Sequence, residues 1–119
     1  MKEFKGTPGP WVVDVRGGCV AVYPDGEQSE TPGCHYDDKR NIAYSSKGAE
    51  YDRVVGYWNM DKKTIRDYTL IAAAPDLLKE LQKLRDYVIN ICGVDDEDCD
   101  SEHPLMSSQA AISKALGEE

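Results

Sequence analysis

The apolar residues in the C-terminal half of the chain recur with a spacing that few structures use. Successive members of the series are four, three, four and three residues apart: Leu77, Leu81, Leu84, Val88 and Ile91. This is the heptad spacing of the contact positions in paired helices. The stripe is narrower than the apolar face a helix usually presents to a globular core, so it favours a helix-to-helix seam. Either the last helix of the chain or another subunit can fill the seam. We favour a contribution from another subunit, which makes the stripe an oligomer interface.

The residues around the stripe predict a helical part over residues 59–93. Three further apolar positions recur at helical spacing: Ile65, Tyr68 and Ala72. Asn59 or Asp61 can cap the first helix. Pro75 has no amide hydrogen to donate, so we expect a break or kink there, with Pro75 in the first turn of a second helix. Gly93 can supply the C-cap of that helix.

The preceding part, residues 7–58, is rich in β-branched and aromatic residues and in glycine, which is typical of antiparallel strands. Four runs are separated by turn signals: 11–15, 19–23, 41–45 and 51–57. Gly17 and Gly18 lie between the first two and allow a tight hairpin. We therefore predict an α+β fold, with an N-terminal antiparallel sheet of about four strands followed by a kinked helix pair and a short C-terminal helix.

The remaining segments complete a single domain over residues 1–119, a common domain size. Residues 27–40 are polar and read as a long loop. An acidic loop is expected over 94–103, followed by the C-terminal helix over 104–117, which begins at a proline and closes at a glycine.

The formal net charge of −8 disfavours duplex nucleic acid and anionic membranes as partners, because both need a basic face. The N-terminal stretch lacks the apolar core of a signal peptide, and no run of apolar residues is long enough to span a membrane, so we expect a cytoplasmic protein. In that reducing compartment the four cysteines favour free thiols: Cys19, Cys34, Cys92 and Cys99.

Catalytic and metal-binding patterns are weak in this sequence. His35 and His103 lie outside any recognisable catalytic motif, and the abundant carboxylates read as solvated surface. The spacing of Cys92, Cys99 and His103 is not that of a zinc site. We therefore predict no catalytic residues, no metal, no cofactor and no enzymatic activity.

Arginine and aromatic residues form a more informative set, because a small phosphorylated ligand with a base needs guanidinium groups and stacking rings. Tyr57 and Trp58 precede the first predicted helix, and Arg66 and Arg85 lie on the helices. The alternative is that Trp58 belongs to the core and that both arginines are solvated.

Two motifs resemble those of a widespread group of small phage and prophage proteins. The first is Thr7-Pro8-Gly9-Pro10-Trp11, and the second is residues 70–78, Leu-Ile-Ala-Ala-Ala-Pro-Asp-Leu-Leu. One branch of similar proteins is the anti-Thoeris sponge family, which captures cyclic ADP-ribose signals of bacterial immunity without cleaving them; some members also hold cyclic oligonucleotides of CBASS immunity. The resemblance implies a sheet followed by helices, and a dimer or a hexamer of dimers.

The same resemblance implies ligand-binding residues. Arg85 falls on the second helix where sponge members use an arginine, and Tyr57 and Trp58 hold the position of a stacking aromatic. Asp67 replaces the usual asparagine, so it would meet a ribose hydroxyl or a base edge, since it repels phosphate. Tyr68 and Thr69 also depart from the group.

The leading hypothesis is therefore a phage-encoded, non-enzymatic sponge that sequesters a cyclic nucleotide immune signal, either a cyclic ADP-ribose isomer or a cyclic oligonucleotide, at a subunit interface. This would inhibit bacterial anti-phage defence. The alternative is an acidic protein-interaction inhibitor that blocks a host defence protein directly, which the charge of −8 favours.

Overall fold

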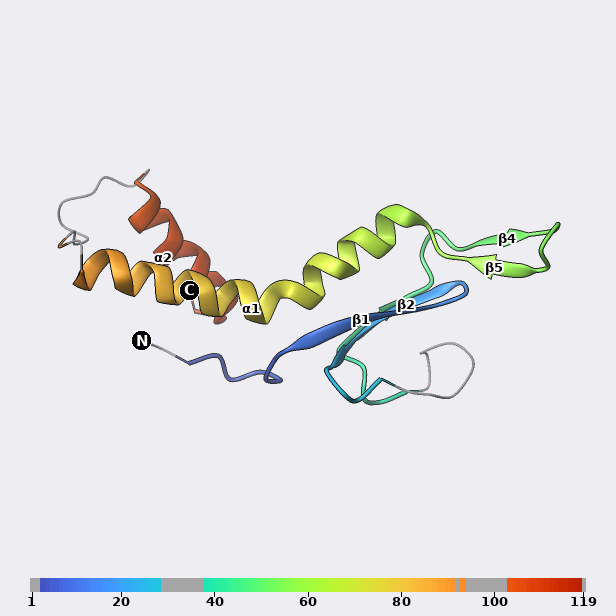
Figure 1. The fold of residues 1–119 in the computed structure, drawn as a ribbon, viewed down its shortest axis with the longest axis horizontal. Helices are drawn as coiled ribbons and strands as arrows, with labels where there is room; N and C mark the ends of the chain where they lie inside the picture. The colour runs from blue at the N-terminus through green and yellow to red at the C-terminus, as the bar shows by residue number, and fades with distance from the viewer. Residues whose placement is uncertain (1–2, 29–37, 92, 94–102, 119) are drawn as a thin grey trace. The chain divides into compact units, whose positions relative to one another are not determined.

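The chain forms two compact units in a computed structural model that describes residues 3–28, 38–91, 93 and 103–118. The sheet unit is Thr7–Pro75, and the helical unit is Met1–Gly6 with Asp76–Glu119. A single domain over 1–119 stays a prediction. The elements, coloured along the chain in Figure 1, are β1 (Trp11–Arg16), β2 (Cys19–Pro24), β3 (Ala43–Ser45), β4 (Glu50–Asp52), β5 (Tyr57–Asn59), α1 (Lys62–Asn90) and α2 (Pro104–Ala115).

The sheet unit is organised around β2, which lies between β1 and β3 in an antiparallel sheet. The continuous apolar run from Val20 to Tyr23 is fully buried, as expected for a central strand. Trp11 pairs with Pro24 at one end of the hairpin and Arg16 with Cys19 at the other. Gly17 takes a positive φ of 52° in the connecting turn, which confirms the predicted glycine hairpin and the α+β class.

The predicted fourth strand, 51–57, is wrong in detail: it contains a turn and belongs to a separate two-stranded sheet, β4–β5. The Asp52 side chain accepts hydrogen bonds from the backbone N–H groups of Val54 and Val55, at 2.9 and 3.1 Å. Gly56 takes a positive φ of 88°. An aspartate that bonds the following amides initiates a turn, and here it outweighs the strand propensity of the two valines.

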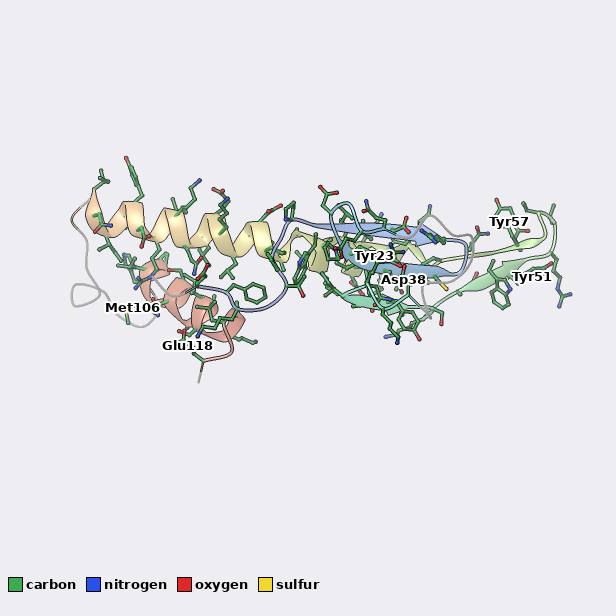
Figure 2. All side chains as sticks on the ribbon, turned by 90° about the horizontal axis from the view of Figure 1, so that it is seen from below. Tyr23, Asp38, Tyr51, Tyr57, Met106 and Glu118 are labelled. Carbon is green, nitrogen blue, oxygen red and sulfur yellow. The ribbon has the colours of Figure 1, made fainter. Side chains whose placement is uncertain are left out.

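A hydrogen-bonded cluster of Tyr23, Asp38 and Arg40 anchors the end of residues 27–40 to the sheet. The hydroxyl of the fully buried Tyr23 donates to Asp38 at 3.1 Å, and Figure 2 shows these two side chains together. Arg40 binds the same carboxylate through Nε at 3.0 Å and through a terminal nitrogen at 3.1 Å. The Arg40 guanidinium holds the pKa of Asp38 well below its usual range. Burial, followed by the bond to Asp38, raises the pKa of Tyr23 from 10.0 to about 12.

These shifted pKa values predict a stability that falls at both extremes of pH. The contribution of Asp38 is present above its unfolded pKa, about 4, and is lost as the pH falls toward its lower folded value. The contribution of Tyr23 is present below pH 10 and is lost as the pH rises toward 12, because the unfolded chain releases that proton first. Denaturant unfolding between pH 9 and pH 12 measures the second effect. A Tyr23→Phe protein with an equally steep decline would contradict it.

The first turn of α1 is capped as the sequence predicts, by Asp61. Its Oδ2 accepts from the Thr64 N–H at 3.3 Å, and its carbonyl accepts from the Ile65 N–H at 3.1 Å. The buried Thr64 hydroxyl also lies 3.1 Å from the Lys47 carbonyl, which ties the turn after β3 to the start of the helix.

The expected pair of helices is instead one helix, because α1 continues through Pro75. A proline disrupts a helix by removing one amide donor and crowding the preceding turn, and its neighbours can retain helical geometry at that cost. The division between the two compact units falls directly after Pro75.

The two motifs of the phage resemblance contact each other within the sheet unit. Gly9 lies so close to the Pro75 ring that a Cβ at position 9 would approach the proline Cβ to 2.6 Å. The peptide bond between Gly9 and Pro10 is cis, and the Trp11 indole N–H donates to the Thr7 carbonyl at 3.2 Å.

The helical unit contains α2 and the second half of α1. His103 caps α2, since its Nδ1 accepts from the Leu105 N–H at 3.1 Å, and Pro104 follows in the first turn. Gly117 ends the helix at a positive φ of 79°, and Gly93, with a φ of 72°, follows the end of α1; both agree with the sequence. The expected acidic loop lies, apart from His103, outside the described residues.

The heptad stripe is divided between two environments. Leu81 and Val88 are half-buried, and together with the more exposed Leu84 and residues of α2 they line a cavity of about 210 Å³. Leu77, Leu84 and Ile91 remain 55%, 61% and 68% exposed. The last helix of the chain therefore covers one side of the stripe and leaves the other side open.

The expectation of free thiols is wrong at Cys19, which is disulfide-bonded. Separation along the chain does not decide such a bond, because it requires only that two cysteines meet in the folded structure. Cys34, Cys92 and Cys99 lie outside the described residues, as do 29–37 of the predicted loop. In the part of the chain that the structure describes, none of the helices is long and apolar enough to cross a membrane.

Candidate functional site

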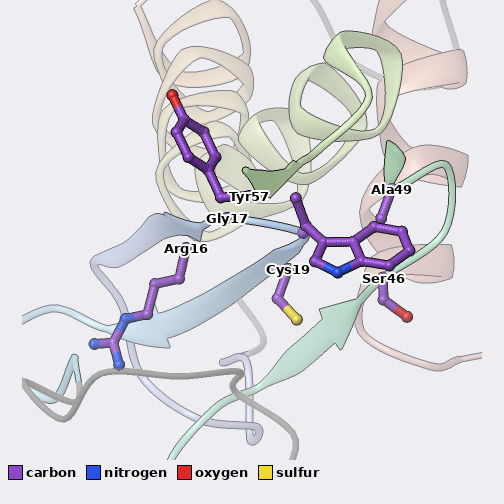
Figure 3. Close-up of a pocket in the computed structure, with 8 residues that line it drawn as sticks. Arg16, Gly17, Cys19, Ser46, Ala49 and Tyr57 are labelled. Atoms are coloured by element: carbon purple, nitrogen blue, oxygen red, sulfur yellow. The ribbon is translucent and has the colours of Figure 1, made fainter. Parts of the chain in front are cut away.

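A cavity of about 660 Å³ opens in the sheet unit where three turns and strand ends meet. This volume lies in the range of small-molecule sites, roughly 300–1,000 Å³. Figure 3 shows that its lining comes from the β1–β2 turn, the segment after β3, and β5. The lining residues are Arg16, Gly17, Gly18, Cys19, Ser46, Ala49, Tyr57 and Trp58.

Gly17 and Gly18 allow the β1–β2 turn to lie close to β5 at this cavity. A Cβ at Gly18 would lie 3.0 Å from the Trp58 Cβ and 3.2 Å from the Ala49 Cβ. A Cβ at Gly17 would lie 3.3 Å from the Trp58 carbonyl oxygen. Gly17 and Gly18 therefore form the hairpin turn and also leave room for Trp58 beside it.

Two aromatic residues, Tyr57 and Trp58, line the cavity. Trp58 is 54% exposed and Tyr57 is 53% exposed, so both rings remain accessible. Tyr51 pairs with Trp58 across the hairpin, with ring centroids 5.5 Å apart and the planes inclined by 58°. Such a pair holds the indole in a preferred tilted geometry. A planar ligand can stack against aromatic faces presented in this way.

Arg16 brings a cationic group to the same cavity. Its Nε donates to Asp14 Oδ2 at 2.9 Å, and the two side chains are 20% and 27% exposed. In Figure 3 the Arg16 guanidinium and the Tyr57 phenol extend away from the turn in different directions.

The structure places the five residues predicted to bind ligand in different surroundings. It brings Tyr57 and Trp58 together in the cavity. Arg66 and Asp67 are exposed on α1 and are not among the residues that line this cavity. Arg85 belongs to the helical unit, where it lines the cavity beside α2 and its Nε donates to the Leu105 carbonyl at 3.4 Å. Their roles in binding stay predictions.

One of the departures from the phage group has a structural role. The Tyr68 hydroxyl donates to the Tyr44 carbonyl at 3.2 Å, joining α1 to β3. Thr69 donates to the carbonyl of Ile65 at 2.7 Å within the helix. Neither Tyr68 nor Thr69 is among the residues that line the cavity.

Arg16 and Ser46 line the cavity but are not among the residues predicted to bind ligand. That Arg16 and Tyr57 line the same cavity depends on how β5 folds back, which no local pattern encodes. The available signal was the arginine next to two glycines, because a glycine turn lets other chain segments approach closely.

Within the described ranges, no group of three or more His, Cys, Asp and Glu side chains could hold a metal ion. The geometry of the cavity supports binding through stacking and ion pairing.

A family model described as Salmonella phage P22 protein Y8K6 matches residues 1–119. Neither a curated protein nor a solved structure matches the chain.

Proposed function

The chain belongs to the family of the Salmonella phage P22 protein Y8K6, and we propose that it is a sponge that binds a cyclic nucleotide immune signal of the bacterial host without cleaving it. The signal would be a cyclic ADP-ribose isomer or a cyclic oligonucleotide. Sequestration lowers the free concentration of such a messenger by mass action, so it requires tight binding and no reaction.

One observation carries this proposal: Tyr57, Trp58 and Arg16 line the same cavity. A nucleotide offers a planar base and an anionic phosphate, and the cavity offers half-exposed rings and a guanidinium. This set replaces Arg85 as the first choice for phosphate recognition in the proposal, because Arg16 shares the cavity with the aromatic residues.

Asp14 restricts the ligands that suit the site. Its carboxylate partly neutralises Arg16 through the ion pair with Nε at 2.9 Å. A dense cluster of phosphates would meet stronger repulsion from the Asp14 carboxylate than a single phosphate would. The proposal therefore favours cyclic ligands with isolated phosphodiester or diphosphate groups.

The direct test is capture followed by release. The protein is incubated with cyclic ADP-ribose isomers and with cyclic di- and trinucleotides, separated from unbound ligand, and denatured. We expect the release of an intact ligand. An altered ligand would show catalysis and contradict the sponge. If no ligand is captured, the acidic protein-interaction inhibitor becomes the better hypothesis, with the net charge of −8 in its favour.

Tyr57→Ala should weaken capture by about 10-fold or more, because it removes one stacking ring from the cavity. Val55→Ala is the matched control, since Val55 lies between β4 and β5 in the same hairpin, is 54% exposed, and is not among the lining residues. Equilibrium dialysis with a ligand found by the capture test measures both. Equal losses in the two variants would mean that the hairpin, and not the Tyr57 ring, supports binding.

A further inference from the structure

We propose that the cavity of about 210 Å³ beside α2, here called the α2 cavity, binds a small apolar carboxylic acid. The hydrocarbon body of the ligand would lie between α1 and α2, with its carboxylate at Arg85. All the residues that line this cavity belong to the helical unit. The inference therefore does not depend on the ligand cavity of the sheet unit.

The walls of the α2 cavity are almost entirely apolar. α1 contributes Leu81, Leu84 and Val88, and the first turn of α2 contributes Pro104 and Leu105. Leu105 is 4% exposed and Leu84 is 61% exposed, so the lining includes both a buried and a solvent-accessible side chain. A ligand can therefore enter from solvent and place an apolar group against the buried wall, where water finds few polar partners.

The volume of the α2 cavity limits the size of its ligand. An apolar cavity of about 150 Å³ is large enough to bind benzene, whereas sites for drug-sized molecules span roughly 300–1,000 Å³. A volume of about 210 Å³ lies between these two values. It suits a single ring with one substituent, or a hydrocarbon chain of similar size, and it lies below the range of sites that enclose a whole nucleotide.

The charge of the lining favours an anionic ligand. Arg85 and His103 line the α2 cavity, and none of the described lining residues is acidic. This contrasts with the whole chain, which has 22 acidic and 14 basic residues. The Arg85 Nε donates to the Leu105 carbonyl at 3.4 Å, which holds the guanidinium beside α2. A guanidinium binds a carboxylate more strongly than it binds a neutral acceptor.

His103 adds a hydrogen-bond donor to the same cavity. Its Nδ1 accepts from the Leu105 N–H at 3.1 Å, so the neutral ring carries its proton on Nε2. The exposed imidazole can therefore donate from Nε2 while Nδ1 still caps α2. Both polar side chains thus favour a head group that accepts hydrogen bonds.

A ligand in the α2 cavity would add to a thin core. Among the described residues of the helical unit, the apolar side chains that reach full burial are Leu105 and Ile112, both on α2. A molecule that binds only the folded state stabilises that state by mass action. Occupancy of the cavity should therefore raise the thermal stability of the helical unit.

Titration of the full chain with benzoate, followed by two-dimensional NMR, tests the site. We expect saturable shifts with a dissociation constant of about 1 mM or below. The shifts should centre on the amides of Val88 and Leu105 and should not include Val20 of the sheet unit. Benzyl alcohol, which has the ring without the charge, should bind about 5-fold or more weakly. Acetate, which has the charge without the ring, should not compete.

Two variants separate the charge from the cavity. Arg85→Gln should weaken benzoate binding by about 5-fold or more and leave the binding of benzyl alcohol unchanged. Ser108→Leu should abolish the binding of both probes, because Ser108 lines the cavity and a larger side chain there fills it. Lys83→Gln is the matched control, since it removes one positive charge from the same helix and Lys83 is not among the lining residues. Circular dichroism confirms that each variant retains its helices.

Each of four results would overturn the inference. Shifts that stay linear up to about 20 mM benzoate, far above the expected dissociation constant, would exclude a site. Equal affinities for benzoate and benzyl alcohol would remove the anionic ligand class. Benzoate binding that survives in Ser108→Leu would place the ligand elsewhere. An equal loss in Lys83→Gln and Arg85→Gln would mean that overall charge, and not Arg85, attracts the carboxylate. None of these results bears on nucleotide capture by the sheet unit.

Discussion

Gly48→Ala is expected to lower the free energy of unfolding by about 2–4 kcal/mol, because two costs act at one position. Gly48 has a φ of 82°, which an L side chain rarely adopts. A Cβ there would also lie 2.7 Å from the Asp61 Cβ. Asp61 caps α1, and the Lys47 carbonyl accepts a hydrogen bond from the Thr64 hydroxyl. Displacing Asp61 would therefore loosen the junction between the turn after β3 and the start of α1.

Gly26→Ala separates the two costs. Gly26 has a similar φ of 91°, but a Cβ at that position meets nothing within 4 Å. Its alanine variant should therefore show the backbone cost alone, about 1–2 kcal/mol. Urea unfolding followed by tryptophan fluorescence measures both proteins. Equal losses at Gly48 and Gly26 would mean that the approach to Asp61 contributes nothing to stability.

Tyr23→Ala is expected to cost about 3–5 kcal/mol, the usual range for deleting a fully buried aromatic side chain. The substitution leaves a cavity in the core beside β2 and also removes the hydroxyl that donates to Asp38. Tyr23→Phe keeps the ring and should cost only about 0.5–1.5 kcal/mol, since Arg40 still holds the carboxylate.

Chemical denaturation of the two Tyr23 variants, with Tyr44→Ala as the control, distinguishes packing from hydrogen bonding. Tyr44 is a tyrosine of the neighbouring strand β3 that is 39% exposed, so truncating it should cost less than truncating Tyr23. If Tyr23→Phe proved as unstable as Tyr23→Ala, the hydroxyl bond to Asp38 would be the dominant contribution and the packing argument would be wrong.

Local chemistry decided how much of the fold the sequence predicted. The glycine hairpin before β2, the Asp61 cap and the left-handed Gly117 each depend on a few adjacent residues, and all are confirmed. The β4–β5 hairpin was missed because Val54 and Val55 have strand propensity, whereas Asp52 turns the chain through hydrogen bonds to their amides. Helix continuity at Pro75 was missed because one unfavourable residue does not outweigh its helical neighbours.

The candidate site was predictable only in part. Tyr57 and Trp58 stood out because aromatic residues just before a helix can stack on a ligand, and both residues line one cavity. Arg16 lies far from them in the sequence, and only the pairing of β4 with β5 against the glycine turn brings the three together. The heptad stripe was visible as a repeat, but which half α2 covers depends on tertiary packing.

The contact between Gly9 and Pro75 makes two distant sequence signatures one packing requirement. A side chain at position 9 and a proline ring at position 75 would compete for the same space. Substitutions at the two positions are therefore coupled: a relative that gains a larger residue at the first must lose bulk at the second or shift its first strand. The two motifs together therefore indicate this tertiary contact, even in relatives whose sequences between the motifs are too divergent to align.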